Sequence, residues 1–142
     1  MRGKAVTLRT DGASRGNPGP AGIGVVLEAD GEDARLEFHE YIGETTNNVA
    51  EYRALLRGLL EAEKVAPASL TVKCDSELLV RQLNGQYKVK AGHLKPLFLD
   101  ALRRLRGFPA ARIMHVGREE NAAADLLANR AIDDHFQKVR GG

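Results

Sequence analysis

The sequence has 142 residues, of which 43% are hydrophobic and 28% charged, with a formal net charge of +2 and a single cysteine, Cys74. It contains no linker, repeat, secretion signal or apolar run of the roughly 18 residues that a transmembrane helix needs, so we expect one cytoplasmic domain over residues 1–142 without a membrane partner. The lone cysteine excludes an internal disulfide and a cysteine-based metal site, and any metal must therefore be held mostly by oxygen.

The N-terminal part of the sequence predicts an antiparallel meander of three strands. Residues 5–10 alternate in hydrophobicity, residues 23–29 are a short β-rich run, and residues 35–42 alternate again after the turn sequence ADGED. Between the first two strands lies TDGASRGNPGPAG, whose four glycines and two prolines predict an elaborate turn that begins where the first strand ends.

The remaining sequence predicts alternating helices and strands, in the overall order βββαβααβα. The expected elements are a helix from Asn48 to before Pro67, a strand over 69–74, a helix capped by Asp75 or Ser76 and ended by Gly85, a helix over 96–106, a strand over 111–116, and a last helix from Asn121. A strand that follows a helical crossover lies parallel to its neighbour, most simply the first strand. The sequence thus predicts an α/β fold with a mixed five-stranded sheet, three antiparallel strands followed by two parallel ones, covered by helices.

Four acidic residues are predicted to meet at one edge of this sheet. Asp11 and Asp75 directly follow two strands expected to be parallel neighbours, Glu51 lies in the first turn of one helix, and Asp125 lies in the first turn of the last helix. Each acid alone is explained as a turn residue or as a favourable charge at a helix N-terminus. Four clustered carboxylates, however, repel one another unless cations neutralise them or some stay protonated. Their oxygens suit Mg²⁺ or Mn²⁺, and two such ions can support in-line displacement at phosphorus.

A basic segment points to a partner with a phosphate backbone. Residues 81–118 contain 9 Lys or Arg against 1 Asp or Glu, whereas residues 1–80 contain 9 against 13 and residues 119–142 contain 3 against 5. Such a segment is either a solvated helix face or a contact surface for nucleic acid.

Four motifs make the sequence similar to the type 1 ribonuclease H family over nearly the whole chain: TDGASRGNPGPAG, TTNNVAEYRAL, CDSELLVRQLNG and HVGREENAAADLLAN. The resemblance implies the ribonuclease H-like fold and an endonuclease that cleaves the RNA strand of RNA/DNA hybrids, leaving 5′-phosphate and 3′-hydroxyl ends. It also implies two Mg²⁺ or Mn²⁺ ions, both bound by Asp11. Glu51 and Asp75 would hold the ion nearer the leaving group, and Asp125 the ion nearer the attacking water.

The resemblance also implies contacts with the substrate. Asn17, Thr46, Asn47 and Asn48 would line the minor groove of the hybrid, where the 2′-hydroxyl distinguishes RNA from DNA. Gly12 would allow the backbone and the substrate to approach each other closely. Alternatively, Asn47 and Asn48 serve only as helix caps.

A further catalytic position has two candidates. His115 stands ten residues before Asp125, as a catalytic histidine does in many relatives, but it also falls within a predicted strand. Shorter relatives with an HVxRE pattern place an arginine there, so we favour Arg118. An arginine cannot act as a base at neutral pH, and its charge would act on the phosphate or the departing product.

The chain resembles the short form of the family, without a tryptophan-containing basic protrusion. Substrate binding is therefore expected to use the basic segment, through Arg81, Lys88, Lys90, His93 and Lys95. We expect a monomer. Two other functions stay open: a non-catalytic module that binds hybrids, and a nuclease of the same fold that acts on double-stranded RNA or DNA junctions.

Overall fold

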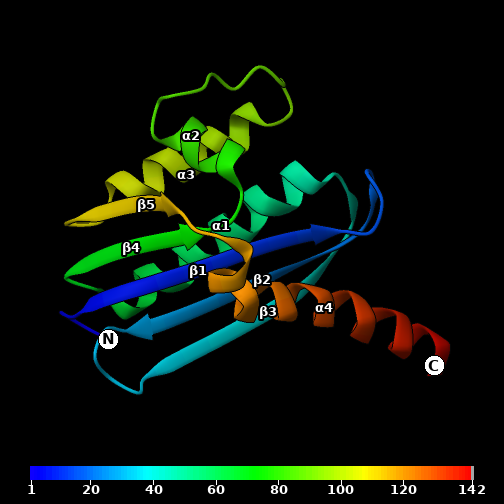
Figure 1. Cartoon of the computed structure of the whole chain (residues 1–142), viewed down its shortest axis with the longest axis horizontal. Coiled ribbons are helices and arrows are strands. Elements are labelled where there is room, and N and C mark those ends of the chain that lie inside the picture. The colour runs from blue at the N-terminus through cyan, green and yellow to red at the C-terminus, as the bar shows by residue number, and fades with distance from the viewer. Residues whose placement is uncertain (142) are drawn as a thin grey trace.

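The predicted mixed sheet is confirmed, with strand order β3-β2-β1-β4-β5 (Figure 1). The computed structural model describes residues 1–141, so the last residue of the predicted 1–142 domain lies outside the described part. The strands are β1 (Ala5–Ser14), β2 (Gly19–Ala29), β3 (Arg35–Thr45), β4 (Ser69–Cys74) and β5 (Ala111–His115). The first three form the antiparallel meander, β4 pairs parallel to β1, and β5 pairs parallel to β4.

Helices cover both faces of the sheet. They are α1 (Asn47–Val65), α2 (Glu77–Leu83), α3 (Lys95–Arg106) and α4 (Ala122–Gly141), and a short 3₁₀ segment, η1 (Arg118–Asn121), precedes α4. Figure 1 shows α1 behind the sheet and α4 crossing in front of it, with the C-terminal part of α4 extending past the strands. No helix within residues 1–141 combines the length and the apolar character needed to cross a membrane.

The buried run in β2 explains how one strand supports two layers. Val25 and Leu27 belong to the core cluster on the α1 side, whereas Val26 packs with Ala124 and Leu127 of α4. Successive side chains of a strand point to opposite faces, so a continuous apolar run is the pattern of a strand covered on both sides. Both helices that carry proposed site residues, α1 and α4, are therefore anchored on the same strand, β2.

The glycine-rich segment is mostly strand, which corrects the prediction of a turn up to residue 22. β1 continues to Ser14 and β2 already begins at Gly19. A Cβ atom on Gly24 would lie 2.1 Å from the carbonyl oxygen of Ala124 in α4, and one on Gly22 would lie 2.4 Å from that of Ala128. These two glycines are needed because the backbone of α4 touches the backbone of β2, and not because the chain turns there.

The helix boundaries differ from the prediction by one or two residues. Helix α1 begins at Asn47, and its N-cap is Thr46, whose Oγ1 accepts a hydrogen bond from the Val49 amide at 3.3 Å. Helix α2 is capped by Ser76, one of its two predicted caps. The last helix starts at Ala122, because the predicted first residue, Asn121, ends the 3₁₀ segment.

Candidate active site

Two carboxylates lie next to each other because the parallel ladder between β1 and β4 ends there. The last paired residues of that ladder are Thr10 and Cys74, and the next residues along the two strands are Asp11 and Asp75. Asp75 directly follows β4, as predicted. The prediction that Asp11 follows the end of its strand is wrong, because β1 continues to pair with β2 as far as Ser14. The ladder with β4 ends at Thr10, so the Asp11 side chain is still free to face the neighbouring carboxylate.

A close backbone contact brings the third carboxylate to the same place. The amide of Gly12 donates a hydrogen bond to Glu51 Oε1 at 2.6 Å. A Cβ atom on Gly12 would lie 2.2 Å from the carbonyl carbon of Ala50, so α1 and β1 approach more closely than any other residue would allow. Glu51 lies just beyond the first turn of α1, not within it as predicted. Its position is set by the contact with β1 and not by the charge preference of a helix N-terminus.

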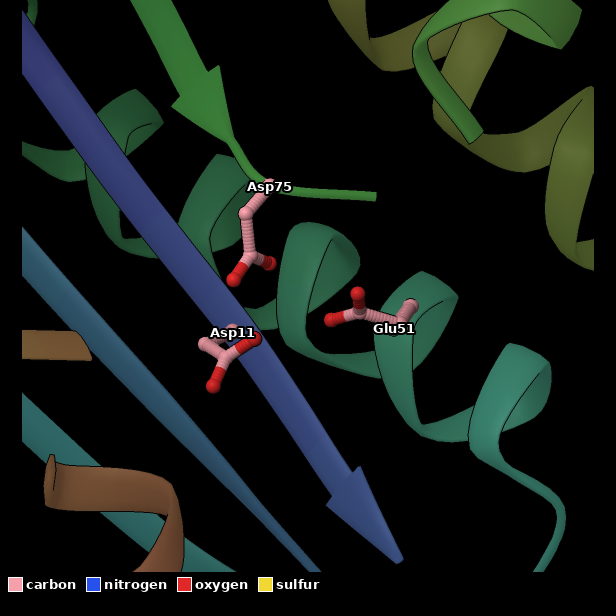
Figure 2. Close-up of side chains that lie close together, drawn as sticks. All are labelled: Asp11, Glu51 and Asp75. Atoms are coloured by element: carbon pink, nitrogen blue, oxygen red, sulfur yellow. The ribbon is translucent and has the colours of Figure 1, made fainter. Parts of the chain in front are cut away.

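Asp11, Glu51 and Asp75 form one carboxylate cluster. One oxygen atom from each lies within 4.8 Å of the other two, and Figure 2 shows the three side chains pointing toward one another from β1, α1 and the end of β4. Asp11 is 5% exposed and Glu51 is 7% exposed. The donor set consists only of carboxylate oxygens, which is the ligand type that Mg²⁺ and Mn²⁺ prefer.

Burial and mutual repulsion hold protons on this cluster when no cation is bound. Burial, followed by the charges of Glu51 and Asp75, raises the pKa of Asp11 to about 10. Burial also raises the pKa of Glu51 to about 8, although the hydrogen bond from the Gly12 amide acts in the opposite direction. Buried acids that cannot all ionise together are the environment that a divalent cation stabilises most, so the residues present are suited to such an ion.

Asp125 stands apart from the three-residue cluster but adjoins it. It lies in the first turn of α4, as predicted. A side-chain hydrogen bond with Asp125 is among the causes that raise the pKa of Asp11, so the two carboxyl groups are neighbours. The amide nitrogen of Asn129, one turn further along α4, lies 3.0 Å from the Asp125 carbonyl oxygen and 3.4 Å from its Oδ1.

The predicted substrate contacts lie where the β1–β2 turn meets α1. Asn17 Oδ1 accepts a hydrogen bond from the Asn47 amide at 3.0 Å, which joins the turn to the start of the helix. The side chains of Asn17, Asn47 and Asn48 are exposed. Capping of α1 is performed by Thr46, so the alternative that Asn47 and Asn48 act only as caps is not what the structure shows.

The two candidates for the further catalytic position lie on either side of a short connection. His115 is the last residue of β5, where it pairs with Cys74 in the parallel ladder, and Arg118 is the first residue of η1. Both side chains are exposed. The preference for Arg118 stays a prediction.

A groove next to the start of α1 contains residues that sequence reasoning missed. It encloses about 520 Å³ and is lined by Asn48, Leu78, Gln82, Gln86, Tyr87, Lys88, Lys90, Ala91 and Leu94. Lys88 and Lys90 were predicted, whereas Tyr87 and the two glutamines were not. The guanidinium carbon of Arg81 lies over the Tyr87 ring, 5.3 Å from the ring centroid. Arg81 is also paired with Glu77 at 2.8 Å. The interleaving of an aromatic residue with basic ones in QYKVK is the signal that was available.

The comparisons with known proteins agree with this architecture. The reverse transcriptase-like family matches residues 9–131 of the chain. The crystal structure of RNase H1 from the halophilic archaeon Halobacterium salinarum is 40% identical with a TM-score of 0.88, over 92% of this chain and 98% of that one. The structure of LC11-RNase H1 in complex with an RNA/DNA hybrid is 46% identical with a TM-score of 0.85, over 92% of this chain and 99% of that one.

A longer relative matches this chain over only part of the relative's own length. A bifunctional protein of Mycobacterium tuberculosis is 44% identical over 94% of this chain, and the chain spans 37% of the length of that relative. The sheet order and the carboxylate cluster define a protein of the ribonuclease H-like class. Within that class, the chain belongs to the type 1 ribonuclease H family, as its four motifs predicted.

Proposed function

We propose that this chain is an endonuclease that hydrolyses the RNA strand of RNA/DNA hybrids with two divalent cations, leaving 5′-phosphate and 3′-hydroxyl ends. The observation that carries the proposal is the meeting of Asp11, Glu51 and Asp75 within 4.8 Å, two of them buried. A related protein, LC11-RNase H1, has been crystallised with an RNA/DNA hybrid, which supports the choice of substrate.

The residues present divide naturally into two ligand sets. Asp11, Glu51 and Asp75 would hold one ion, and Asp11 with Asp125 would hold the second. When bound, Mg²⁺ or Mn²⁺ would lower the pKa of water at the site and stabilise the leaving oxygen. The protein's own part is orientation. The Gly12 amide fixes the direction of Glu51, and the end of the β1–β4 ladder fixes the two aspartates side by side.

Two polar surfaces beside the cluster would hold the two strands of the duplex. The exposed amides of Asn17, Asn47 and Asn48 are suited to ribose hydroxyls, which only the RNA strand carries. Lys88 and Lys90 form no ion pair within residues 1–141 and line the groove that begins at Asn48, so they are suited to the phosphates of the other strand. We assign Arg118 an electrostatic role toward the cleaved phosphate or the departing product.

One assay separates the proposed function from its alternatives. A hybrid labelled on the RNA strand, a double-stranded RNA, a DNA duplex and a DNA junction are incubated with the protein in Mg²⁺, in Mn²⁺ and with a chelator. We expect cleavage of the RNA strand of the hybrid in either metal and none with the chelator. Binding of the hybrid without cleavage would instead indicate a non-catalytic module. Preferential cleavage of double-stranded RNA or of the junction would indicate another substrate for the same fold.

The double variant Lys88→Gln/Lys90→Gln should bind the hybrid more weakly and with a shallower salt dependence. Each lost phosphate contact reduces the slope of log affinity against log salt by about 0.9 or less, because fewer counterions are released on binding. Fluorescence anisotropy between 50 and 200 mM salt, roughly the range in which such slopes are measured, provides the test. Lys4→Gln is the control. Lys4 is paired with Glu32 and directly precedes the first residue of β1, at the end of the strand away from Asp11. Equal slopes for the wild type and the double variant would remove the groove from the interface.

A further inference from the structure

Asn121 joins the two backbone segments that carry Asp11 and Asp125. Its side chain is fully buried, at 0% exposure, and its Nδ2 donates a hydrogen bond to the Thr10 carbonyl oxygen at 2.9 Å. Thr10 immediately precedes Asp11 in β1, and Asn121 stands four residues before Asp125, at the end of η1. One side chain therefore links the strand that holds one proposed ligand to the start of the helix that holds another.

The two polar atoms of the Asn121 side chain are satisfied unequally. Within residues 1–141, the Oδ1 atom of Asn121 is buried without a hydrogen-bond partner. An unpaired buried acceptor costs about 1–3 kcal/mol, roughly what the bond from Nδ2 to Thr10 would offset. A leucine would remove the unpaired Oδ1, but it would also leave the buried Thr10 carbonyl without the Asn121 donor. The contribution of Asn121 therefore comes from the single bond that joins β1 to the start of α4.

Other contacts fix α4 further along the helix. Arg15 pairs with Asp133 at 2.7 Å, and the Tyr41 ring stacks on the His135 ring with 3.7 Å between the ring centroids. α4 meets β2 through small residues, with Ala124 and Ala128 lying against Gly24 and Gly22. These contacts set how close α4 lies to the sheet. The contacts at η1 fix the start of the helix, next to Asp125. Arg9 donates to the Glu120 carbonyl oxygen at 2.9 Å on the exposed side, and Asn121 donates to Thr10 on the buried side.

We propose that Asn121 is a positioning residue of the metal site, which sets the separation between the Asp11 and Asp125 carboxylates. This inference rests on the proposed function, because it concerns the second of the two ligand sets. Asn121 binds no ion itself and acts through the Thr10 carbonyl and the start of α4. Hydrogen-bonded partners that orient metal ligands contribute about 10–100-fold to metal affinity or activity. A ligand pair drawn from two separate elements needs such a partner more than ligands on one rigid element do.

The test measures Mn²⁺ binding by electron paramagnetic resonance, without substrate, together with thermal unfolding. The Mn²⁺ site of interest is the one formed by Asp11 and Asp125, which Asp125→Asn should remove. Asn121→Leu should lower the Mn²⁺ affinity of this site by about 10–100-fold. Its unfolding midpoint should fall, because the leucine leaves the buried Thr10 carbonyl without a donor, so Mn²⁺ binding is measured at a temperature at which the variant is fully native. In the hybrid assay, kcat should fall at low Mn²⁺ and recover at high Mn²⁺, whereas KM for the hybrid should not change.

Two further variants separate positioning from a general structural effect. Asn84→Leu removes a similar bond, from an asparagine amide to the Ile113 carbonyl oxygen in β5, and should leave Mn²⁺ binding unchanged. In the Asp125→Asn background, Asn121→Leu should have no further effect on Mn²⁺ binding, because its target is already lost. If Asn121→Leu is poorly folded, Asn121→Ala is measured at a temperature at which it is fully native.

The possible outcomes are distinct. Wild-type Mn²⁺ affinity in folded Asn121→Leu or Asn121→Ala would overturn the positioning role while leaving the proposed function intact. An equal loss of affinity in Asn84→Leu would also overturn it, because the effect would then be structural. Failure of the wild-type protein to bind Mn²⁺ or to cleave the hybrid would overturn the proposed function itself.

Discussion

Asp75→Asn should abolish cleavage of the RNA/DNA hybrid without unfolding the protein. The substitution keeps the size and shape of the side chain but removes one of the three carboxylates that lie within 4.8 Å of one another. Because Asp75 would bind the ion directly, the loss in kcat should exceed the roughly 100-fold upper range for residues that only orient metal ligands. Initial rates in saturating Mg²⁺ and circular dichroism measure the two halves of this expectation.

Asp100→Asn is the matched control for that experiment. Asp100 lies in α3, where it is paired with Arg103 at 2.6 Å and Arg104 at 3.4 Å. Removing its charge changes the net charge of the protein by the same amount, but it should leave kcat within about twofold, since exposed ion pairs contribute little. Full activity of Asp75→Asn, with Mg²⁺ present and the fold intact, would contradict the proposed metal site.

The positions of the site elements along the chain can be predicted from the sequence because they depend on local patterns and one topological rule. The alternation in residues 5–10 and the apolar run in 69–74 mark two strands, and the right-handed crossover between them places these strands side by side. The proximity of Asp11 and Asp75 follows from that pairing, and the structure shows it. The mixed sheet was predicted for the same reason.

What the sequence cannot reveal are the contacts between residues that are distant in the chain. Glycines are equally typical of turns and of close backbone approach, and only the position of α4, about 100 residues later, distinguishes the two roles for Gly22 and Gly24. The bond from Asn121 to Thr10 spans 111 residues and has no local signature. The position of Asp125 outside the three-residue cluster likewise depends on how α4 packs against the sheet.

Asp11→Asn should make the metal-free protein more stable while removing its catalytic activity. In the folded, metal-free protein, burial and the charges of Glu51 and Asp75 raise the pKa of Asp11 from an ordinary value of 3.8 to about 10. Between these two pH values the folded protein retains a proton that the unfolded chain has released. The free energy of unfolding of the metal-free wild type should therefore fall as the pH rises from about 4 to about 10. Glu51, with its pKa raised to about 8, adds to the fall in the lower part of that range.

An asparagine at position 11 needs no proton to be buried, so the variant should escape most of this loss. One unit of pKa corresponds to about 1.4 kcal/mol. At pH 7 the free energy of unfolding of the metal-free variant should therefore exceed that of the wild type by on the order of 2–4 kcal/mol. Urea unfolding with a chelator at pH 5, 7 and 9 would measure it, with Asp100→Asn again as the control for a change in net charge. A variant no more stable than the wild type at pH 7 would show that the carboxylates do not repel one another in the folded protein.

Adding Mg²⁺ should then reduce or reverse the difference in the free energy of unfolding between Asp11→Asn and the wild type. A ligand that binds only the folded state stabilises it in proportion to the logarithm of its concentration relative to Kd, and the wild type would gain this term in full. The cation also replaces the proton on Asp11, so the pH dependence of the wild type should flatten, whereas that of the variant should hardly respond. The repulsion among Asp11, Glu51 and Asp75 thus weakens the metal-free fold for the same physical reason that it strengthens cation binding.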